Sequence, residues 1–211
     1  IEDDAIVTEF AGDEKRYLMT LREIKLPGLH NAENYMTAIA LTWGQCPVES
    51  IIETAKTFGG VEHRLEFVAE KHGVTYINGS IDSSPTRTAA ALSAIPERSI
   101  VLICGGYDKH IPFAPLAEAV LRHPGVHDLV LTGATAGMIA RAMTDDPRYA
   151  ARVESGFRMT VVSDFDEAFR TAAAKAKPGD TVLLSPACAS FDAFPNFEVR
   201  GRHFKELVHA L

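Results

Sequence analysis

The sequence predicts an α/β fold, with a mostly parallel β-sheet covered by helices on both faces and a smaller part before it. Short apolar runs of strand length, such as residues 99–104, alternate with amphipathic helical segments. These runs are apolar throughout, as in parallel strands that are buried on both faces. The sequence Phe58-Gly59-Gly60 interrupts the chain before this regular pattern begins. We therefore expect two domains, residues 1–61 and 62–211.

The first domain is expected to hold a β-hairpin over residues 5–26 around Ala11-Gly12-Asp13-Glu14, a helix over 32–43, and a helix from Pro47 to about Thr57. Leu26-Pro27-Gly28 breaks the chain before the first helix. Asn31 is its expected N-cap, with Asn34 three residues later. The apolar side chains Tyr35, Ile39 and Leu41 are expected to point inward.

The second domain is expected to open with a short strand pair, residues 64–69 and 74–78, around His72-Gly73. Strands and helices then alternate: helix 85–95, strand 99–104, helix 115–122, strand 128–132, helix 135–143, strand 159–162, helix 166–175, strand 181–184, and a last helix from about Phe197. Ligands of parallel sheets bind beyond the carboxyl ends of the strands. That rule selects three loops, residues 78–84, 105–109 and 185–192.

Two of these loops have the chemistry of an anion site. Gly105 and Gly106 allow a sharp turn and a close approach to a ligand, and Lys109 adds a compact positive charge. A plain turn with a solvated lysine explains the same residues. The small residues of 185–192 expose backbone N–H groups, and Ser190 adds a hydroxyl suited to a carboxylate. Taken alone, the hydroxyl-rich loop 78–84 is more typical of helix capping.

Composition argues against several other classes of protein. A net charge of −7 does not favour nucleic-acid binding, and the longest apolar runs are far too short for a membrane span. Cys46, Cys104 and Cys188 are odd in number and lack C-x-x-C spacing, so we expect reduced thiols in a cytoplasmic protein, with neither a disulfide nor a zinc site. No histidine has dense metal-ligand spacing.

A nucleophilic Cys188 with His203 or His209 is conceivable, but no orienting group is evident and G-x-S-x-G is absent. We predict that Cys188 is a buried small hydrophobic residue. The phosphate-binding motif G-x-x-x-x-G-K-[ST] is also absent. The chain opens on Ile1-Glu2-Asp3-Asp4 without an initiator Met, which suggests a fragment, although processing gives the same start.

Several motifs occur in a fixed order: LPGLHNAEN at residues 26–34, HRLE at 63–66, GGYDK at 105–109, and SPACASFD at 185–192, followed by Phe194, Asn196-Phe197-Glu198 and Arg200-Gly201. In this order they resemble the Mur ligases, the ATP-dependent amino-acid ligases of cell-wall synthesis. The last stretch is similar to the branch of the family that adds D-glutamate. The resemblance covers nearly the whole chain.

The resemblance implies a Rossmann-like C-terminal Mur ligase domain over 62–211, preceded by the tail of the central ATP-binding domain over 1–61. It implies cytoplasmic, ATP-dependent joining of D-glutamate to UDP-N-acetylmuramoyl-L-alanine in peptidoglycan synthesis. The ATP γ-phosphate would pass to a carboxylate of the nucleotide sugar, and the D-glutamate amine would attack the acyl phosphate, largely a proximity effect. The main binding elements for ATP and Mg²⁺ would lie upstream of this chain. No nucleic acid or membrane partner is implied.

By the same resemblance, Asn34 and Arg64 would contact the nucleotide. Ser83, Lys109, Ser190, Phe191 and Phe197 would surround D-glutamate, and this chain would supply no catalytic residue or metal ligand. Two positions depart from the family pattern. Gly79 replaces the aspartate of an N-D-S motif, and Ile81 stands where many relatives carry a lysine. A carboxylate expected near the nucleotide is therefore missing.

Two other functions remain open at this point. A non-catalytic nucleotide or amino-acid binding module could use the same edge of the sheet. Another amide-forming ligase, such as folylpolyglutamate synthetase, is a second alternative, although the stretch 185–197 favours the D-glutamate branch. Continuation of the gene upstream into a G-x-x-G-K-[ST] loop would separate a ligase from a binding module.

Overall fold

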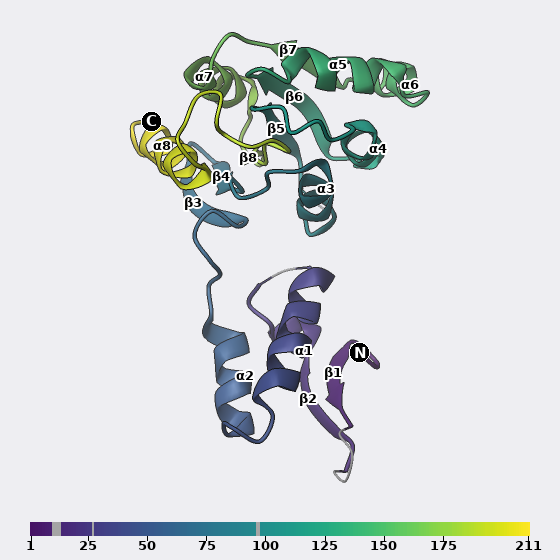
Figure 1. Ribbon diagram of the computed structural model, residues 1–211, viewed down its shortest axis with the longest axis vertical. Helices are drawn as coiled ribbons and strands as arrows, with labels where there is room; N and C mark the ends of the chain where they lie inside the picture. The colour runs from purple at the N-terminus through teal and green to yellow at the C-terminus, as the bar shows by residue number, and fades with distance from the viewer. Residues whose placement is uncertain (10–13, 27, 96–97) are drawn as a thin grey trace. The chain divides into compact units, whose positions relative to one another are not determined.

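The computed structural model describes residues 1–9, 14–26, 28–95 and 98–211, so most of the expected turn at 11–14 lies outside the described residues. The chain divides into two compact units, Ile1–Gly60 and Val61–Leu211, whose elements are labelled in Figure 1. None of the helices within the described ranges is long and apolar enough to cross a membrane.

The smaller unit has an antiparallel pair and two helices. Its elements are β1 (Ala5–Thr8), β2 (Arg16–Thr20), the 3₁₀ helix η1 (Leu21–Glu23), α1 (Leu29–Thr42) and α2 (Val48–Thr57). Side chains from both strands and both helices share one small core, which includes Ile6, Met19, Ile39 and Ala55. The hairpin and the two helices predicted from sequence are therefore present.

Two details predicted for the first helix are wrong. Asn31 is not the N-cap, because α1 begins at Leu29 after Gly28, whose φ of 101° is readily adopted by glycine. Leu41 does not point inward, since it is 71% exposed whereas Ile39 is buried. Residues two positions apart lie on nearly opposite faces of a helix, so Ile39 and Leu41 cannot both face the core.

The larger unit is built on a six-stranded sheet with the order β3-β4-β8-β5-β6-β7. Among the described strands of this sheet, β3 and β4 pair antiparallel and the other neighbours pair parallel. The strands are β3 (Glu66–Lys71), β4 (Val74–Asn78), β5 (Ile100–Gly105), β6 (Val126–Thr132), β7 (Arg158–Val161) and β8 (Thr181–Leu184). The helices are α3 (Pro85–Ser93), α4 (Ala114–Arg122), α5 (Ala136–Asp145), α6 (Tyr149–Glu154), α7 (Phe165–Lys175) and α8 (Phe197–His209). The short helix α6 was not predicted.

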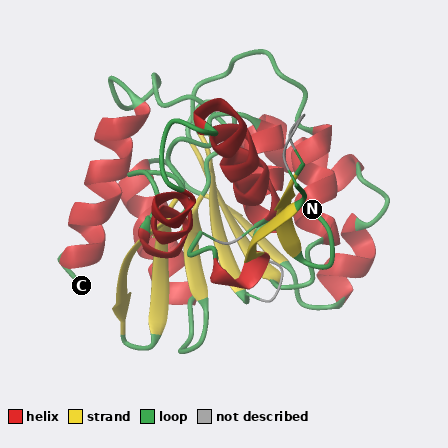
Figure 2. Cartoon of the chain, turned by 90° about the horizontal axis from the view of Figure 1, so that it is seen from below, coloured by secondary structure: helices red, strands yellow, loops and turns green. Residues whose placement is uncertain are grey.

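Helices cover both faces of this sheet, as Figure 2 shows with red helices on either side of yellow strands. Ile100, Leu102 and Cys104 of β5 pack into the core layer that contains α3, α4 and α5. Val101 and Ile103 of the same strand enter the opposite layer, with α7 and α8. This alternation explains why the strand is apolar at every position, and it confirms the predicted α/β class.

The strand order brings the three loops selected from sequence to one edge. They follow β4, β5 and β8, and β8 lies between the other two strands. Because these three strands are parallel, their carboxyl ends lie side by side.

Candidate functional site

Main-chain hydrogen bonds join the three loops at the carboxyl edge of the sheet. The Gly79 N–H donates to the Leu184 carbonyl at 2.7 Å, and the Gly105 N–H donates to the Pro186 carbonyl at 2.8 Å. Further out, the Tyr107 N–H donates to the Ala189 carbonyl at 2.9 Å. The end of β8 and the loop after it therefore lie between the other two loops and accept main-chain hydrogen bonds from both.

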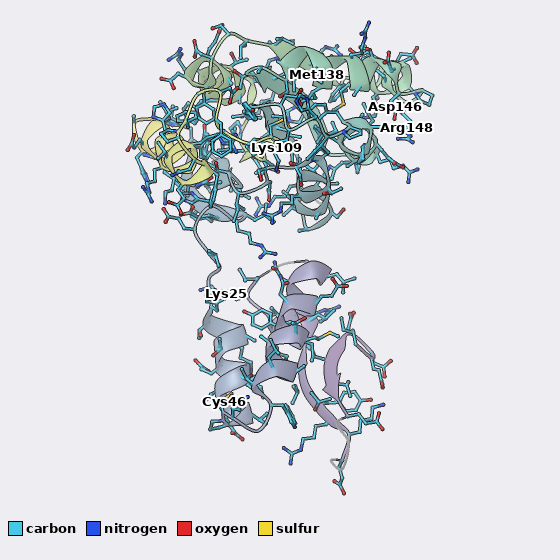
Figure 3. All side chains as sticks on the ribbon, viewed as in Figure 1. Lys25, Cys46, Lys109, Met138, Asp146 and Arg148 are labelled. Carbon is cyan, nitrogen blue, oxygen red and sulfur yellow. The ribbon has the colours of Figure 1, made fainter. Side chains whose placement is uncertain are left out.

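Lys109 and Ser83, predicted from different loops, are in direct contact. The Lys109 Nζ donates to the Ser83 carbonyl at 3.1 Å, and the lysine side chain is exposed. Figure 3 labels Lys109 in the larger unit. One carbonyl leaves two ammonium protons of Lys109 for other acceptors. An exposed ammonium held at a strand end is suited to an anionic group.

Ser190 is the most unusual of the predicted residues. It is only 2% exposed, and its Oγ has no hydrogen-bond partner among the described residues. A buried hydroxyl without a partner is unfavourable by about 1–3 kcal/mol, so a ligand that bonded it would recover that cost. The next residue, Phe191, is 65% exposed and meets the Tyr107 ring edge-to-face with centroids 5.9 Å apart.

Phe197 begins α8, where the Asn196 side chain caps the helix by accepting from the Val199 N–H at 2.8 Å. The Phe197 carbonyl accepts a hydrogen bond from the Ser80 hydroxyl at 2.8 Å, and the Phe197 ring packs edge-on against the His63 ring. The predicted substrate residues therefore come from all three loops and from the start of α8.

The two predicted nucleotide contacts lie elsewhere in the chain. Asn34 has an exposed side chain on α1 of the smaller unit. Arg64 is exposed in the segment before β3, between His63 and Leu65, which have φ values of 67° and 45°. Left-handed backbone at two non-glycine residues is unfavourable, so the contacts around His63 must hold the turn that presents Arg64.

Position 79 lacks the carboxylate that the family pattern predicts, but a second carboxylate, that of Asp82, lies beside it and was not predicted from the sequence. A Cβ atom at Gly79 would lie 2.7 Å from Asp82 Oδ2, so the Asp82 carboxyl fills the space beside that position. Asp82 is 7% exposed and accepts a hydrogen bond from the Ser185 hydroxyl at 2.8 Å. Burial raises the pKa of Asp82 to about 6, despite that hydrogen bond and the nearby arginines.

A cavity of about 490 Å³ lies beside the predicted residues, and none of those five lines it. It opens where β5, β6 and β7 end, between Gly106, Thr132, Asp164 and Asp192. Thr132 Oγ1 is buried there without a partner among the described residues. This cavity could not be predicted from the sequence, because its walls come from loops far apart in the chain.

The cysteines do not form a nucleophilic site. All three are free thiols, and Cys104 and Cys188 are buried. Burial raises the pKa of Cys188 to about 11, and its nearest polar partner is the Thr135 hydroxyl at 3.2 Å. The imidazole of His203 instead lies 2.6 Å from an Asp166 carboxylate oxygen.

Glu62, His63 and Glu66 have ligand atoms within 4.8 Å of one another, the geometry of a candidate cation site. The position is already used by Lys205, whose Nζ lies 2.6 Å from Glu62 Oε1 and 3.0 Å from Glu66 Oε1. Asn78 Nδ2 lies 2.9 Å from His63 Nδ1, so the amide of Asn78 joins this cluster. We interpret the cluster as a structural ion-pair network.

Comparison with known proteins gives the class of this chain. Residues 63–188 match the family described as Mur ligase, glutamate ligase domain. The chain therefore belongs to the Mur ligase family, as the order of its motifs predicted. The fold agrees: a bifunctional folylpolyglutamate synthase/dihydrofolate synthase from Yersinia pestis superimposes with a TM-score of 0.63 at 15% identity, covering 99% of this chain and 46% of that one.

Two curated relatives indicate which branch of the family this chain is similar to. The chain is 50% identical over 193 residues to the UDP-N-acetylmuramoylalanine–D-glutamate ligase of Clostridium novyi (strain NT). The matched stretch covers 90% of this chain and 40% of that protein. It is 45% identical to the ligase of the same name from Symbiobacterium thermophilum, over 100% of this chain and 44% of that protein. The chain thus spans about two fifths of the length of these relatives.

Proposed function

We propose that this chain is the C-terminal portion of a cytoplasmic, ADP-forming ligase that joins D-glutamate to UDP-N-acetylmuramoyl-L-alanine in peptidoglycan synthesis. Residues 62–211 are the domain that binds D-glutamate, and residues 1–61 are the tail of the central ATP-binding domain. The relatives at 45–50% identity carry this activity in their names, which supports the proposal.

The unpartnered Ser190 hydroxyl is the observation that carries the assignment of the site. D-glutamate has two carboxylates, and the edge of the sheet offers one buried hydroxyl at Ser190 and one exposed ammonium at Lys109. Hydrogen bonds to a charged acceptor are about twice as strong as neutral ones. We assign the apolar surface of the site to Phe191, which follows Ser190 in the chain, and to Phe197 at the start of α8.

The residues present fit only part of ATP. Asn34 and Arg64 have exposed polar side chains that can bond the base, ribose or phosphates. Bound Mg²⁺ would neutralise charge on the phosphates during transfer. The chain lacks the phosphate-binding motif G-x-x-x-x-G-K-[ST], so we assign binding of the β- and γ-phosphates to another part of the protein. The role of this chain is to hold the amine of D-glutamate for attack.

The test is steady-state kinetics of Lys109→Ala and Ser190→Ala in the full-length protein. Each variant loses one hydrogen bond to a carboxylate, worth about 1.5–3 kcal/mol, so kcat/KM for D-glutamate should fall about tenfold or more. Lys177→Ala is the matched control, because Lys177 is exposed in the turn before β8, at the opposite edge of the sheet. Unchanged kcat and KM for D-glutamate in both variants would overturn the assignment of the site.

A further inference from the structure

Arg200 is a buried cation in α8 that sequence reasoning left without a role. It is 2% exposed and makes four hydrogen bonds with residues that the structure describes. Its Nε donates to Ser80 Oγ at 3.0 Å and its Nη2 to the Ser80 carbonyl at 2.9 Å. Its Nη2 also reaches the Cys188 carbonyl at 3.0 Å, and its Nη1 the Ala189 carbonyl at 3.2 Å. One side chain therefore links the loop after β4 to the loop after β8.

The third loop is attached to the same group. The Ala189 carbonyl that accepts from Arg200 also accepts from the Tyr107 N–H at 2.9 Å. A Cβ atom at Gly106 would lie 3.3 Å from Arg200 Nη1, so the loop after β5 packs directly on the guanidinium. Arg200 is thus in contact with all three loops that carry the proposed D-glutamate residues.

The charge of Arg200 is not neutralised by a bonded anion. Within the described ranges, no carboxylate lies in ion-pair contact with it, and all four acceptors are neutral oxygens. Burial lowers the pKa of Arg200 to about 10, which leaves it protonated at neutral pH. A buried, unpaired cation is costly, so a fold that only needed packing here would be served by an apolar residue. The planar fork of a guanidinium, in contrast, fixes several acceptors in one geometry.

We propose that Arg200 is a positioning residue, a buried clamp that holds the three loops in the one arrangement in which Ser190 and Lys109 face the same ligand. This inference rests on the proposed function. The guanidinium acts through the loops: its donors are directed at Ser80, Cys188 and Ala189, and it need not touch D-glutamate.

The experiment compares Arg200→Lys and Arg200→Met with Arg202→Met, an exposed arginine on the same helix. Amide hydrogen exchange is followed in the 211-residue chain at a temperature at which circular dichroism shows each variant folded. In Arg200→Lys, exchange of the Tyr107 and Gly79 amides should accelerate about tenfold or more. Amides shared by β5 and β6 should keep the parental rate. Arg200→Met should show the same pattern more strongly, and Arg202→Met should match the parent.

Kinetics in the full-length protein then separate positioning from stability. Arg200→Lys should raise KM for D-glutamate about tenfold, with KM for ATP changed less than about twofold. Uniformly faster exchange across the sheet, or looser loops with an unchanged KM for D-glutamate, would show that Arg200 only stabilises the fold. If the parent protein forms no product with D-glutamate, the proposed function fails, while the selective exchange of Tyr107 and Gly79 still decides whether Arg200 is a clamp.

Discussion

Asp82 illustrates how the surroundings of a single residue set a property of the whole unit. Its carboxyl is buried beside Gly79 with one hydroxyl donor, and burial raises its pKa to about 6. The folded protein therefore keeps the Asp82 proton up to about pH 6, whereas an unfolded aspartate releases it near pH 4. The free energy of unfolding should fall by about 3 kcal/mol between these pH values and stay reduced above them.

Replacing Asp82 by Asn should remove this pH dependence. We expect Asp82→Asn and the parent to have similar stability near pH 4, and the variant to be more stable by about 1–3 kcal/mol near pH 8. Urea unfolding at several pH values measures the difference, with exposed Asp145→Asn as control. A difference between parent and Asp82→Asn that is the same at both pH values would contradict the prediction.

Cys188 gives a second prediction at the scale of the residue. Because burial raises its thiol pKa to about 11, Cys188 should resist iodoacetamide near pH 7.5 in the folded chain, as should buried Cys104. Half-buried Cys46 should be alkylated first, and peptide mass spectrometry reads all three sites.

In the full-length protein, Cys188→Ala should keep kcat within about tenfold of the parent. A loss of about a thousandfold with unchanged stability would indicate that Cys188 is a nucleophile.

Single residues were predictable where the chemistry is local. Lys109 and Ser190 follow strands in short polar loops, so their position could be inferred from the sequence. Arg200 could have been noticed, since it shares the buried stripe of Phe204 and Val208 at four-residue spacing, but its acceptors at Ser80 lie 120 positions away. No local pattern encodes such a contact, and the same is true of Asp82 against Ser185.

At the scale of elements, the turn after β5 depends on glycine. Gly105 has a φ of 118°, and a Cβ atom there would clash with the carbonyl oxygen of Thr132. Gly137 in α5 is the opposite case, because nothing lies within 4 Å of its Cβ position. We expect Gly105→Ala to destabilise the fold by more than about 2 kcal/mol and Gly137→Ala to stabilise it by about 0.5–1 kcal/mol.

Thermal and urea unfolding of the two glycine variants check this prediction side by side. The same chemical change, one added methyl group, should have effects of opposite sign. If Gly105→Ala retained parental stability, the close approach of β5 and β6 at their carboxyl ends would have to be wrong.

The order of elements in the larger unit was predicted well because apolar strands and amphipathic helices differ in period. The ends of elements were less predictable. Gly28 starts α1 earlier than Asn31, and Leu41 lies on the exposed face because Ile39 is already buried. The helix α6 is six residues long, too short to show an amphipathic pattern in the sequence. It is held instead by tertiary contacts such as the Tyr149–Phe157 ring pair.

At the scale of the whole molecule, we expect the 211-residue chain to release no phosphate from ATP above background. No loop in the sequence has the G-x-x-x-x-G-K-[ST] pattern needed to enclose the β- and γ-phosphates. A phosphate-release assay with the full-length protein as positive control measures this directly. Clear turnover by the purified 211 residues would overturn our assignment of the phosphate-binding elements to another part of the protein.

The strand order of the larger unit also bears on how the protein is made. β8 is the last strand along the chain, yet it pairs with β4 on one side and β5 on the other. While the ribosome is still adding residues before Thr181, both of those strands have an unpaired edge, and such edges promote association between nascent chains. Premature termination anywhere before β8 would leave a sheet in two halves. Synthesis of β8 is therefore the step that joins the two halves into one continuous sheet and removes both unpaired edges.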